Sequence, residues 1–365
     1  MPAMSVDDSR TCHVIHLVTA ELALHQLPLL RALWRPADET RPGRPLLMHV
    51  GRGALPTGLA ADRRVPVPAQ LTHLAARRLA EFLPTVGPVV LHAWTPAAAR
   101  VAVSAAAARG CGLVIEAAGR PDTVLGELAA GLGARGRLVV SGSPAIGGTS
   151  RRGLPIGGVV QIPPAADAAA LASVDRAAVR ARCGLDGDEF VACALPPVSR
   201  AAGTMLAAWG TLLLSQIEPR VRILVPERNR EAERMRRLAV SCHHDHVVCA
   251  TGERLTLAEL VVAADVALLL PAENVAGEAA AWALAAERPL IVSAGTPLAA
   301  WVGESAAATV PAGGPAKAVA AALLGICEKA SADAARAAST AGGTARPDWS
   351  QRLARYAALY AELAS

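Results

Sequence analysis

The stretch "VALLLPAENVAGEAAAWALAAERPLIVSAGTP" (266–297) joins an apolar run, a short acidic loop, an alanine-rich segment and a second apolar run. Its opening run, 266–270, predicts a strand, because a short, wholly apolar run is typical of a strand buried on both faces. The loop carries Glu273 and Glu278, and the segment behind it holds only Ala, Leu and Trp until Glu287. The stretch therefore predicts a strand, a loop, a helix and a second strand. Three interpretations of the loop stay open: a substrate site, the remains of one, or a connection between core elements.

Length and composition favour two sizeable α/β cores. The chain has 365 residues, which is long for one domain and typical of two. Hydrophobic residues make up 53% of the chain and aromatic residues only 3%. We therefore expect helices packed tightly on sheets, with few large rings between them.

The charge is mildly basic and unevenly distributed. Residues 1–170 carry 17 Arg against 11 Asp and Glu, a net charge of +6, whereas residues 171–365 carry 19 Lys and Arg against 20 acidic residues, a net charge of −1. A basic N-terminal half suits anionic ligands or a weak peripheral contact with an anionic membrane surface. No nucleic-acid partner is expected, because the charge is dispersed and no basic stretch is interleaved with aromatic residues.

The cysteines and the N-terminus predict a reduced, cytoplasmic protein. Seven Cys are scattered singly, an odd number that favours free thiols over a disulfide framework. The first 18 residues carry Asp before their apolar run and lack a basic segment, so no signal peptide is expected. No spanning helix is expected either, because no run of about 20 apolar residues is free of charge.

Short apolar runs alternate with amphipathic or alanine-rich segments along the chain. The pattern predicts helices at 69–83 and 95–109, further helices between the later strands, and strands near 13–18, 46–50, 88–92, 112–116, 137–141, 158–162, 189–194, 221–225, 246–250, 265–270, 289–293 and 307–310. Strands that are apolar on both faces and alternate with helices are typical of parallel sheets covered by helices. We therefore expect an α/β chain of two Rossmann-like, doubly wound parallel-sheet domains that face a cleft. Ligands of such sheets bind beyond the C-terminal ends of the strands.

A proline pair followed by a small-residue connector, near 163–175, marks a domain boundary. We place an N-terminal domain at 1–168, a C-terminal domain at 169–345 and a C-terminal helix at 346–365. The helix has Asp348 as a candidate N-cap and carries an apolar face, so it should pack on another element. That face comprises Trp349, Leu353, Tyr356 and Tyr360.

The motifs along the chain follow a familiar order. They are "VVLHAW" (89–94), "VIEAAGR" (114–120), "QIPPAAD" (161–167), "RARCGL" (180–185), the segment 246–273, "RPLIVSAGTP" (288–297) and the closing helix with its Trp and two Tyr. Together they resemble the glycosyltransferases of the GT-B fold, in particular family 4. The resemblance implies a nucleotide-sugar donor on the second domain, an acceptor against the first, and a last helix that crosses back onto the first domain.

The resemblance also places the donor side, although the donor motifs are incomplete. It implies substrate contacts from Arg200, Thr251, Gly252, Glu253, Glu273, Asn274, Gly277 and Glu278. The family neutralises the donor's pyrophosphate with an Arg and a Lys rather than a metal. Here Pro196 or Pro197 stands at the Arg position, and Arg200 lies near the Lys position. No cofactor and no metal are therefore expected.

Single residues in these motifs have plainer alternatives. Arg200 is one of many surface arginines, and Glu273 is an acid near a helix N-terminus, where negative charge is favoured in any case. The family's second carboxylate, which holds the ribose, corresponds to Ala281 or Trp282 in the two registers that the sequence allows. No catalytic residue is identifiable.

On the acceptor side the candidates are His92 and Arg120. His92 ends a strand and is either a contact for a sugar hydroxyl or an interior histidine with its hydrogen bonds satisfied; the sequence identifies no carboxylate partner for it. Arg120 follows the position where the resemblance expects a His, and it could pair with Glu116.

"CHHDHVVC" (242–249) is the sharpest local cluster of metal-ligand types. Its spacing matches no zinc pattern, and Cys249 falls in an expected buried strand. A polar surface turn is favoured over a metal site.

The sequence thus predicts a glycosyltransferase-like protein. If it is active, the resemblance implies transfer of a sugar from a nucleotide sugar to an unnamed acceptor with retention of configuration. The alternative is a catalytically inactive GT-B module that binds a sugar, a nucleotide or a protein. One side chain bears on the choice, because the ring of Trp282 lies either in the core or in the space of the ribose.

Overall fold

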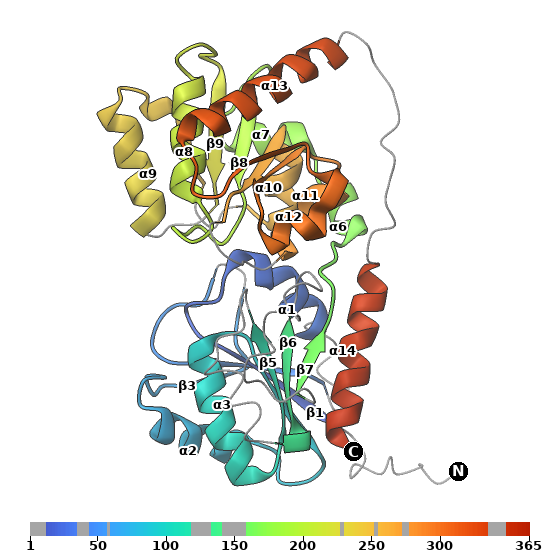
Figure 1. Ribbon diagram of the computed structural model, residues 1–365. Helices are drawn as coiled ribbons and strands as arrows, with labels where there is room; N and C mark the ends of the chain where they lie inside the picture. Colours follow the sequence, from blue (N-terminus) through green and yellow to red (C-terminus); the bar gives the residue numbers. More distant parts are fainter. Residues whose placement is uncertain are drawn as a thin grey trace. The chain divides into compact units, whose positions relative to one another are not determined.

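The computed structural model describes residues 12–34, 44–56, 59–117, 133–140, 158–226, 230–251, 255–271, 277–334 and 348–365. These residues form two units. Unit 1 comprises the described residues up to 163 together with 350–365, and unit 2 comprises those from 164 to 349. Within the described residues, the chain therefore leaves unit 1 once and returns to it with its last helix (Figure 1).

Unit 1 is built on a seven-stranded, all-parallel sheet with the strand order β3-β2-β1-β4-β5-β6-β7. The strands are β1 (His13–Val18), β2 (Leu46–Val50), β3 (Arg63–Val65), β4 (Val89–Ala93), β5 (Gly112–Ala117), β6 (Gly136–Val140) and β7 (Val159–Gln161). The helices are η2 (Leu24–Gln26), α1 (Leu27–Trp34), α2 (Thr72–Phe82), α3 (Pro96–Arg109), η3 (Gly133–Arg135) and α14 (Trp349–Ala364). The helix α14 packs closely on the sheet, since a Cβ at Gly112 would lie 2.9 Å from Leu363.

Unit 2 repeats the plan with a six-stranded parallel sheet of order β10-β9-β8-β11-β12-β13. Its strands are β8 (Phe190–Ala194), β9 (Val221–Val225), β10 (Val248–Ala250), β11 (Val266–Leu269), β12 (Leu290–Ala294) and β13 (Ala308–Pro311). Its helices are α6 (Ala168–Ala172), α7 (Arg176–Arg182), α8 (Thr204–Leu214), α9 (Arg230–Ser241), η4 (Asp245–Val247), α10 (Leu257–Ala263), α11 (Glu278–Ala285), α12 (Pro297–Val302), η6 (Gly303–Ser305) and α13 (Ala316–Ala334).

Two apolar layers hold unit 2 together, one on each face of its sheet. The helices α8, α9 and α13 share one cluster with Ala192 and Ala194, and α7, α10, α11 and α12 share the other with Val191 and Cys193. Neighbouring residues of β8 thus point into opposite layers, as the alternation of a strand requires.

Both sheets have the strand order of a doubly wound Rossmann fold, which confirms the predicted fold class. Each of the predicted strands is present within a residue or two, and the predicted helices α2, α3 and α14 are present within three residues. Strand β3 was not predicted from the sequence. Two of the three residues of β3 are exposed arginines, so this short edge strand lacks the apolar pattern by which strands are found.

The seven cysteines are all free thiols. In the parts of the chain that the structure describes, no helix combines the length and the apolar character that crossing a bilayer requires.

Candidate functional site

The carboxyl edge of the unit 2 sheet is where a doubly wound fold binds its ligand, at the point where the strand order reverses between β8 and β11. The loop that follows β8 contains a cis Pro196–Pro197 bond and ends at Gly203. This loop is pressed onto the end of β11, because a Cβ at Gly203 would lie 1.9 Å from the carbonyl oxygen of Leu270. Gly203 also has a φ of 72°, so two constraints require glycine there.

Arg200 stands in this loop with an exposed side chain. Two hydrogen bonds fix the loop around it: the Thr204 hydroxyl donates to the carbonyl oxygen of Ser199 at 3.0 Å, and the amide of Ala202 donates to the Ser199 hydroxyl at 3.2 Å. Among the described residues, no carboxylate pairs with the Arg200 guanidinium. The loop thus presents one cation at the carboxyl edge of unit 2.

The stretch 266–297 folds as predicted into β11, a loop, α11 and β12. Glu278 is the first residue of α11 and is buried, with 6% of its surface exposed. An acid in this position interacts favourably with the helix dipole. Gly277 precedes it and lies within reach of Pro164 and Trp301. Glu273 and Asn274 lie outside the described residues.

Trp282 lies in the core. Its side chain is 3% exposed, belongs to the apolar layer of α10 and α11, and meets the ring of Trp349 edge to face at 6.1 Å. Ala281, the other residue that can be aligned with the second carboxylate of the family motif, is buried too. The ring of Trp282 is therefore an element of the interior.

Thr251 follows β10 and is held against the neighbouring strand, since both its amide and its hydroxyl donate to the carbonyl oxygen of Val225. It lines a cavity of about 380 Å³ together with Arg182, Cys183, Cys249, Ala250 and Leu255. Gly252 and Glu253 lie outside the described residues. Thr251 is the only one of the three predicted residues here that the structure describes.

Three neutral polar side chains, those of Thr19, Gln26 and Thr95, are buried at the carboxyl edge of unit 1, where Glu21 and Arg52 are exposed. The hydroxyls of Thr19, after β1, and Thr95, after β4, lie 3.0 Å apart at the point where that strand order reverses. Gln26 donates to the carbonyl oxygen of Trp94 at 2.8 Å, and Thr95 caps α3 by accepting from the amide of Ala98. These groups can offer hydrogen bonds to a polar ligand but no charge.

His92 lies in the interior of unit 1. It is fully buried, with one ring nitrogen 2.7 Å from the Tyr360 hydroxyl and the other 3.1 Å from a Glu116 carboxylate oxygen. The Tyr356 hydroxyl donates to the same oxygen of Glu116 at 2.6 Å. The His92 ring also stacks on that of Trp94, 4.5 Å away between centroids. The sequence identified no carboxylate partner for His92, and in the structure this partner is Glu116.

The buried network under α14 shifts the titration of its members. Burial lowers the pKa of His92 to about 3 and raises the pKa of Glu116 to about 7, although the Tyr356 hydroxyl and the nearby Arg352 charge oppose the second shift. Burial, with the charge of Glu116, also raises the pKa values of Tyr356 and Tyr360. At neutral pH the network therefore holds its histidine and tyrosines uncharged. It anchors α14 and has no opening to a ligand.

Two signals in the sequence point to this network. Tyr356 and Tyr360 are the only two tyrosines of the chain and lie one turn apart on one helix. The predicted buried face of α14 was nearly correct: Tyr356 and Tyr360 are buried, but Arg352 is buried in place of the half-exposed Leu353. Arg120, the other predicted residue on this side, lies outside the described residues.

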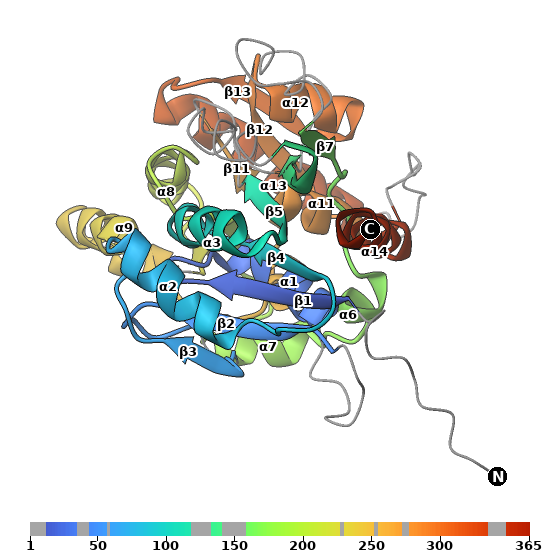
Figure 2. The same ribbon diagram turned by 90° about the horizontal axis from the view of Figure 1, so that it is seen from below.

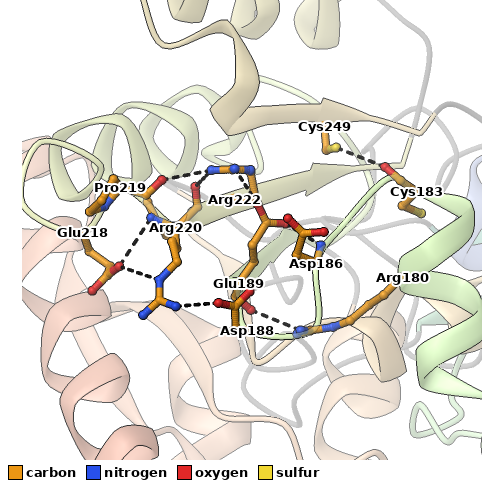
Figure 3. A network of polar contacts seen from close by, with 11 residues as sticks. Arg180, Cys183, Asp186, Asp188, Glu189, Glu218, Pro219, Arg220, Arg222 and Cys249 are labelled. Atoms are coloured by element: carbon orange, nitrogen blue, oxygen red, sulfur yellow. Dashed lines mark hydrogen bonds and ion pairs between the residues drawn. The ribbon is translucent and has the colours of Figure 1, made fainter.

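A larger cavity of about 740 Å³ lies at the opposite, amino edge of the unit 2 sheet, where Phe190, Arg220 and Asp265 stand at the starts of three strands. Figure 3 shows that its charged groups bind one another. Arg220 pairs with Asp188, and Arg222 with Glu189. Arg180 pairs with Asp265 at 2.6 Å and donates to the carbonyl oxygens of Gly187 and Glu189. The cavity is bordered by ion pairs at the edge where doubly wound folds do not bind their ligands.

The 242–249 cluster forms a turn. His244 binds Ser215 and Gln216, with ring nitrogens 3.3 and 2.7 Å from their side chains, and Cys249 lies in β10. Nowhere in the described ranges do three His, Cys, Asp or Glu side chains gather as a metal would require. Through the contacts of His244, this turn is joined to the end of α8.

The solved structures that are similar to the chain share one fold. The structure of HepE from Anabaena in complex with UDP and glucose superimposes with a TM-score of 0.71 at 15% identity, over 95% of this chain and 99% of that one. Sucrose-phosphate synthase from Thermosynechococcus elongatus gives 0.68 at 16% identity, over 97% and 99%. WaaG, a glycosyltransferase involved in lipopolysaccharide biosynthesis, gives 0.62 at 14% identity, over 96% and 97%.

The fold is that of the GT-B glycosyltransferases. The agreement extends over nearly the full length of each protein and therefore covers both Rossmann-like units. No protein-family model matches the sequence, and no curated protein does either.

Proposed function

We propose that this protein is a glycosyltransferase that takes a sugar from a nucleotide-sugar donor. One observation carries the proposal: the whole chain has the GT-B fold of enzymes that transfer sugars, and structures of the similar HepE contain UDP and UDP-glucose. A uridine diphosphate sugar is accordingly the first donor to test. The acceptor is not identified, and retention of configuration follows from the resemblance to family 4.

The donor is proposed to bind at the carboxyl edge of unit 2. Arg200 would pair with the diphosphate, where a charge-assisted hydrogen bond stabilises a leaving group without a metal. The cavity beside Thr251 and the start of α11 at Gly277 and Glu278 flank the same edge. The position of Trp282 supports this proposal over an inactive module, since its ring packs in the core of unit 2.

The acceptor is proposed to bind at the carboxyl edge of unit 1, near Thr19, Gln26 and Thr95. Hydroxyl and amide side chains there match the hydrogen-bonding groups of a sugar or another polar alcohol. This placement differs from the one expected from the sequence, because the ring nitrogens of His92 are occupied by Tyr360 and Glu116.

Ligand-dependent stability tests the donor site. Binding to the native state raises the free energy of unfolding, by about 2.7 kcal/mol at a ligand concentration 100 times Kd. UDP and UDP-glucose should therefore raise Tm, and Arg200→Gln should weaken binding roughly tenfold or more, the worth of one charge-assisted hydrogen bond. Arg220→Gln, an exposed arginine at the opposite sheet edge, is the matched control.

Two results would contradict the proposal. The absence of a shift with any nucleoside diphosphate at millimolar concentration would exclude the donor site. Binding of UDP-glucose without release of UDP, in the presence of a panel of hydroxyl acceptors, would identify the inactive module.

We also propose a weak peripheral contact of unit 1 with an anionic membrane surface. The face formed by β3, α2 and the loop before β3 exposes five arginines against one glutamate and one aspartate, a net charge of +3, and it exposes Leu71 and Leu74 at half or more of their surface. The residues counted are Arg52, Arg63, Arg64, Arg77, Arg78, Asp62 and Glu81. Cationic side chains next to exposed leucines are typical of surfaces that rest on anionic lipid.

Vesicle sedimentation tests this contact. Each surface arginine contributes about 1 kcal/mol near an anionic bilayer, so Arg63→Gln with Arg77→Gln should reduce partition into phosphatidylglycerol vesicles about 30-fold. The control is Arg236→Gln with Arg237→Gln on α9, where both arginines pair with Glu233. Equal binding to neutral vesicles, or an equal loss in the control, would contradict the contact.

A further inference from the structure

The outer face of α8 in unit 2 is apolar from end to end. Trp209, Leu213 and the following Ile217 are 50%, 39% and 67% exposed, and they stand one turn apart on one side of the helix. The sequence 204–217 contains no charged residue. A helix at the surface of a soluble protein normally carries charge on its outer face, so this face is one that another surface covers.

Neighbouring elements hold this face rigid. On one side α13 approaches so closely that a Cβ at Gly210 would lie 2.6 Å from Val319. On the other side α9 lies beside α8 (Figures 1 and 2), and His244 bonds to Ser215 and Gln216 to join the C-terminal ends of the two helices. Val240 of α9, 50% exposed, lies near that joined end. A rigid surface loses little conformational entropy when it is covered.

Most charges around the α8 face are in ion pairs, and α9 as a whole carries four Arg against two Glu, a net charge of +2. On α9, Arg234 pairs with Glu231, and both Arg236 and Arg237 pair with Glu233. Beyond the end of α8, Arg220 pairs with Asp188. This differs from the β3–α2 face of unit 1, whose net positive charge suits anionic lipid. An apolar stripe within a border of ion pairs matches a protein surface of the same kind.

The exposed apolar area of the α8 face and the spacing of its residues indicate which protein surface covers it. Four side chains of this size, about half exposed, offer about 400 Å² of apolar surface. A standard interface takes about 800 Å² from each partner, of which somewhat more than half is apolar. Trp209 and Ile217 stand four residues before and after Leu213, so two α8 helices paired antiparallel about Leu213 would set each Trp209 against Ile217 of the partner subunit. The stripe is thus complementary to itself under a two-fold axis.

We propose that α8 is the interface of a symmetric homodimer, with Leu213 next to the two-fold axis. The inference is independent of the proposed enzymatic function, because it involves neither the carboxyl edges of the sheets nor Arg200. The dimer is expected to form at micromolar concentration, as suits an interface of standard size or less.

Sedimentation equilibrium of the full chain tests the dimer. Leu213→Arg brings two like charges together at the axis and should weaken dimerisation more than 100-fold. Leu74→Arg makes the same change on the half-exposed leucine of α2 and should leave dimerisation unchanged. Circular dichroism of both variants checks that the fold is kept.

A cross-linking experiment tests the geometry without adding charge. In a Cys242→Ser background, which removes the exposed thiol, Leu213→Cys should give a disulfide-linked dimer under mild oxidation, and Leu74→Cys should not. A chain that stays monomeric to about 200 µM would overturn the proposal, and so would a dimer that Leu213→Arg leaves intact. Binding of the monomer to lipid vesicles that Leu213→Arg abolishes would assign the α8 face to a membrane instead.

Discussion

The two units share one sheet order but fill the face beneath their helices differently. In unit 1, His16, His92 and Glu116 lie on three adjacent central strands, under α14. In unit 2 the corresponding strands, β8, β11 and β12, bury only apolar side chains and Ser293. The charges of unit 2 gather at the strand ends, where Asp265 binds Arg176 and Arg180 and accepts from the amide of Val191. One fold thus tolerates either a polar or an apolar interior, although the Nε2 of His16 and the hydroxyl of Ser293 have no hydrogen-bond partner among the described residues.

The two units therefore hold a helix on the sheet in two different ways. Unit 2 holds α11 by packing, which is strong but has little directional preference. Unit 1 holds α14 by hydrogen bonds from two tyrosines to His92 and Glu116, which fix the rotation and the register of the helix. The first arrangement should respond most to loss of volume, and the second to loss of a proton or a hydroxyl.

The largest expected effect is that of Trp282→Ala in unit 2. Removing a large side chain from a packed core costs about 3–5 kcal/mol of unfolding free energy. Amide exchange should rise in α11, β11 and β12, while β1 and β4 of unit 1 stay protected. The control is Val86→Ala, which shortens a side chain with 60% of its surface exposed and should change stability by less than about 0.5 kcal/mol. Equal loss of protection in both units would show that their cores are coupled.

Glu116→Gln should change how the stability of unit 1 depends on pH. Between pH 4.5 and 6.5 the folded pair of His92 and Glu116 keeps one proton, because the pKa of Glu116 is raised to about 7 and that of His92 is lowered to about 3. The unfolded chain also holds one proton in this range, on the histidine. The two states then bind equal numbers of protons, and this pair contributes no pH dependence.

Glutamine at position 116 removes the proton that the pair binds in the folded state. The proton that His92 binds in the unfolded state remains. The variant should therefore lose about 1.4 kcal/mol per pH unit, relative to the native protein, as pH falls from 6.5 to 4.5. Urea unfolding at four pH values in this range measures the difference. A difference that stays constant with pH would contradict the shared proton.

Above pH 6.5 the native pair should behave in the opposite sense. There the unfolded chain has released both protons, while folded Glu116 keeps its own until about pH 7. The contribution of the pair to stability should thus fall slightly between pH 6.5 and 7 and remain level at higher pH.

Tyr356→Phe should have a smaller effect. It removes one hydrogen bond to a buried carboxyl group, worth about 1.5–3 kcal/mol when that group is charged and about 1 kcal/mol when it is protonated. Amide exchange of α14 at pH 8 and at pH 6 measures the stability lost with the charged and with the protonated carboxyl group. The loss of stability should be greater at pH 8. Glu362→Gln on the same helix is the control, because the ion pair of Glu362 with Arg137 is half exposed and contributes less than about 1 kcal/mol.

The sequence predicted most of the fold because both sheets are buried on two faces, so their strands are short apolar runs that stand out from the helices. It missed β3, whose edge position admits exposed arginines. The candidate site was less predictable. The order of the motifs placed the donor loops along the chain. The second carboxylate of the family motif, however, could be aligned with either Ala281 or Trp282, and only the packing shows that both side chains are buried. The partners of His92 were missed because Tyr360 is 268 residues away in sequence, and no local pattern reports such a contact.

The return of the last helix to unit 1 has a consequence for biosynthesis. A ribosome makes unit 2 as one continuous segment, which can fold as soon as it emerges. Unit 1 is made first, yet its row of buried ionisable groups has no cover until residues 350–365 are made, after unit 2. Unit 1 must therefore stay incompletely folded while unit 2 is translated. A messenger truncated before codon 350 should yield a folded unit 2 attached to a first unit that is open to proteases.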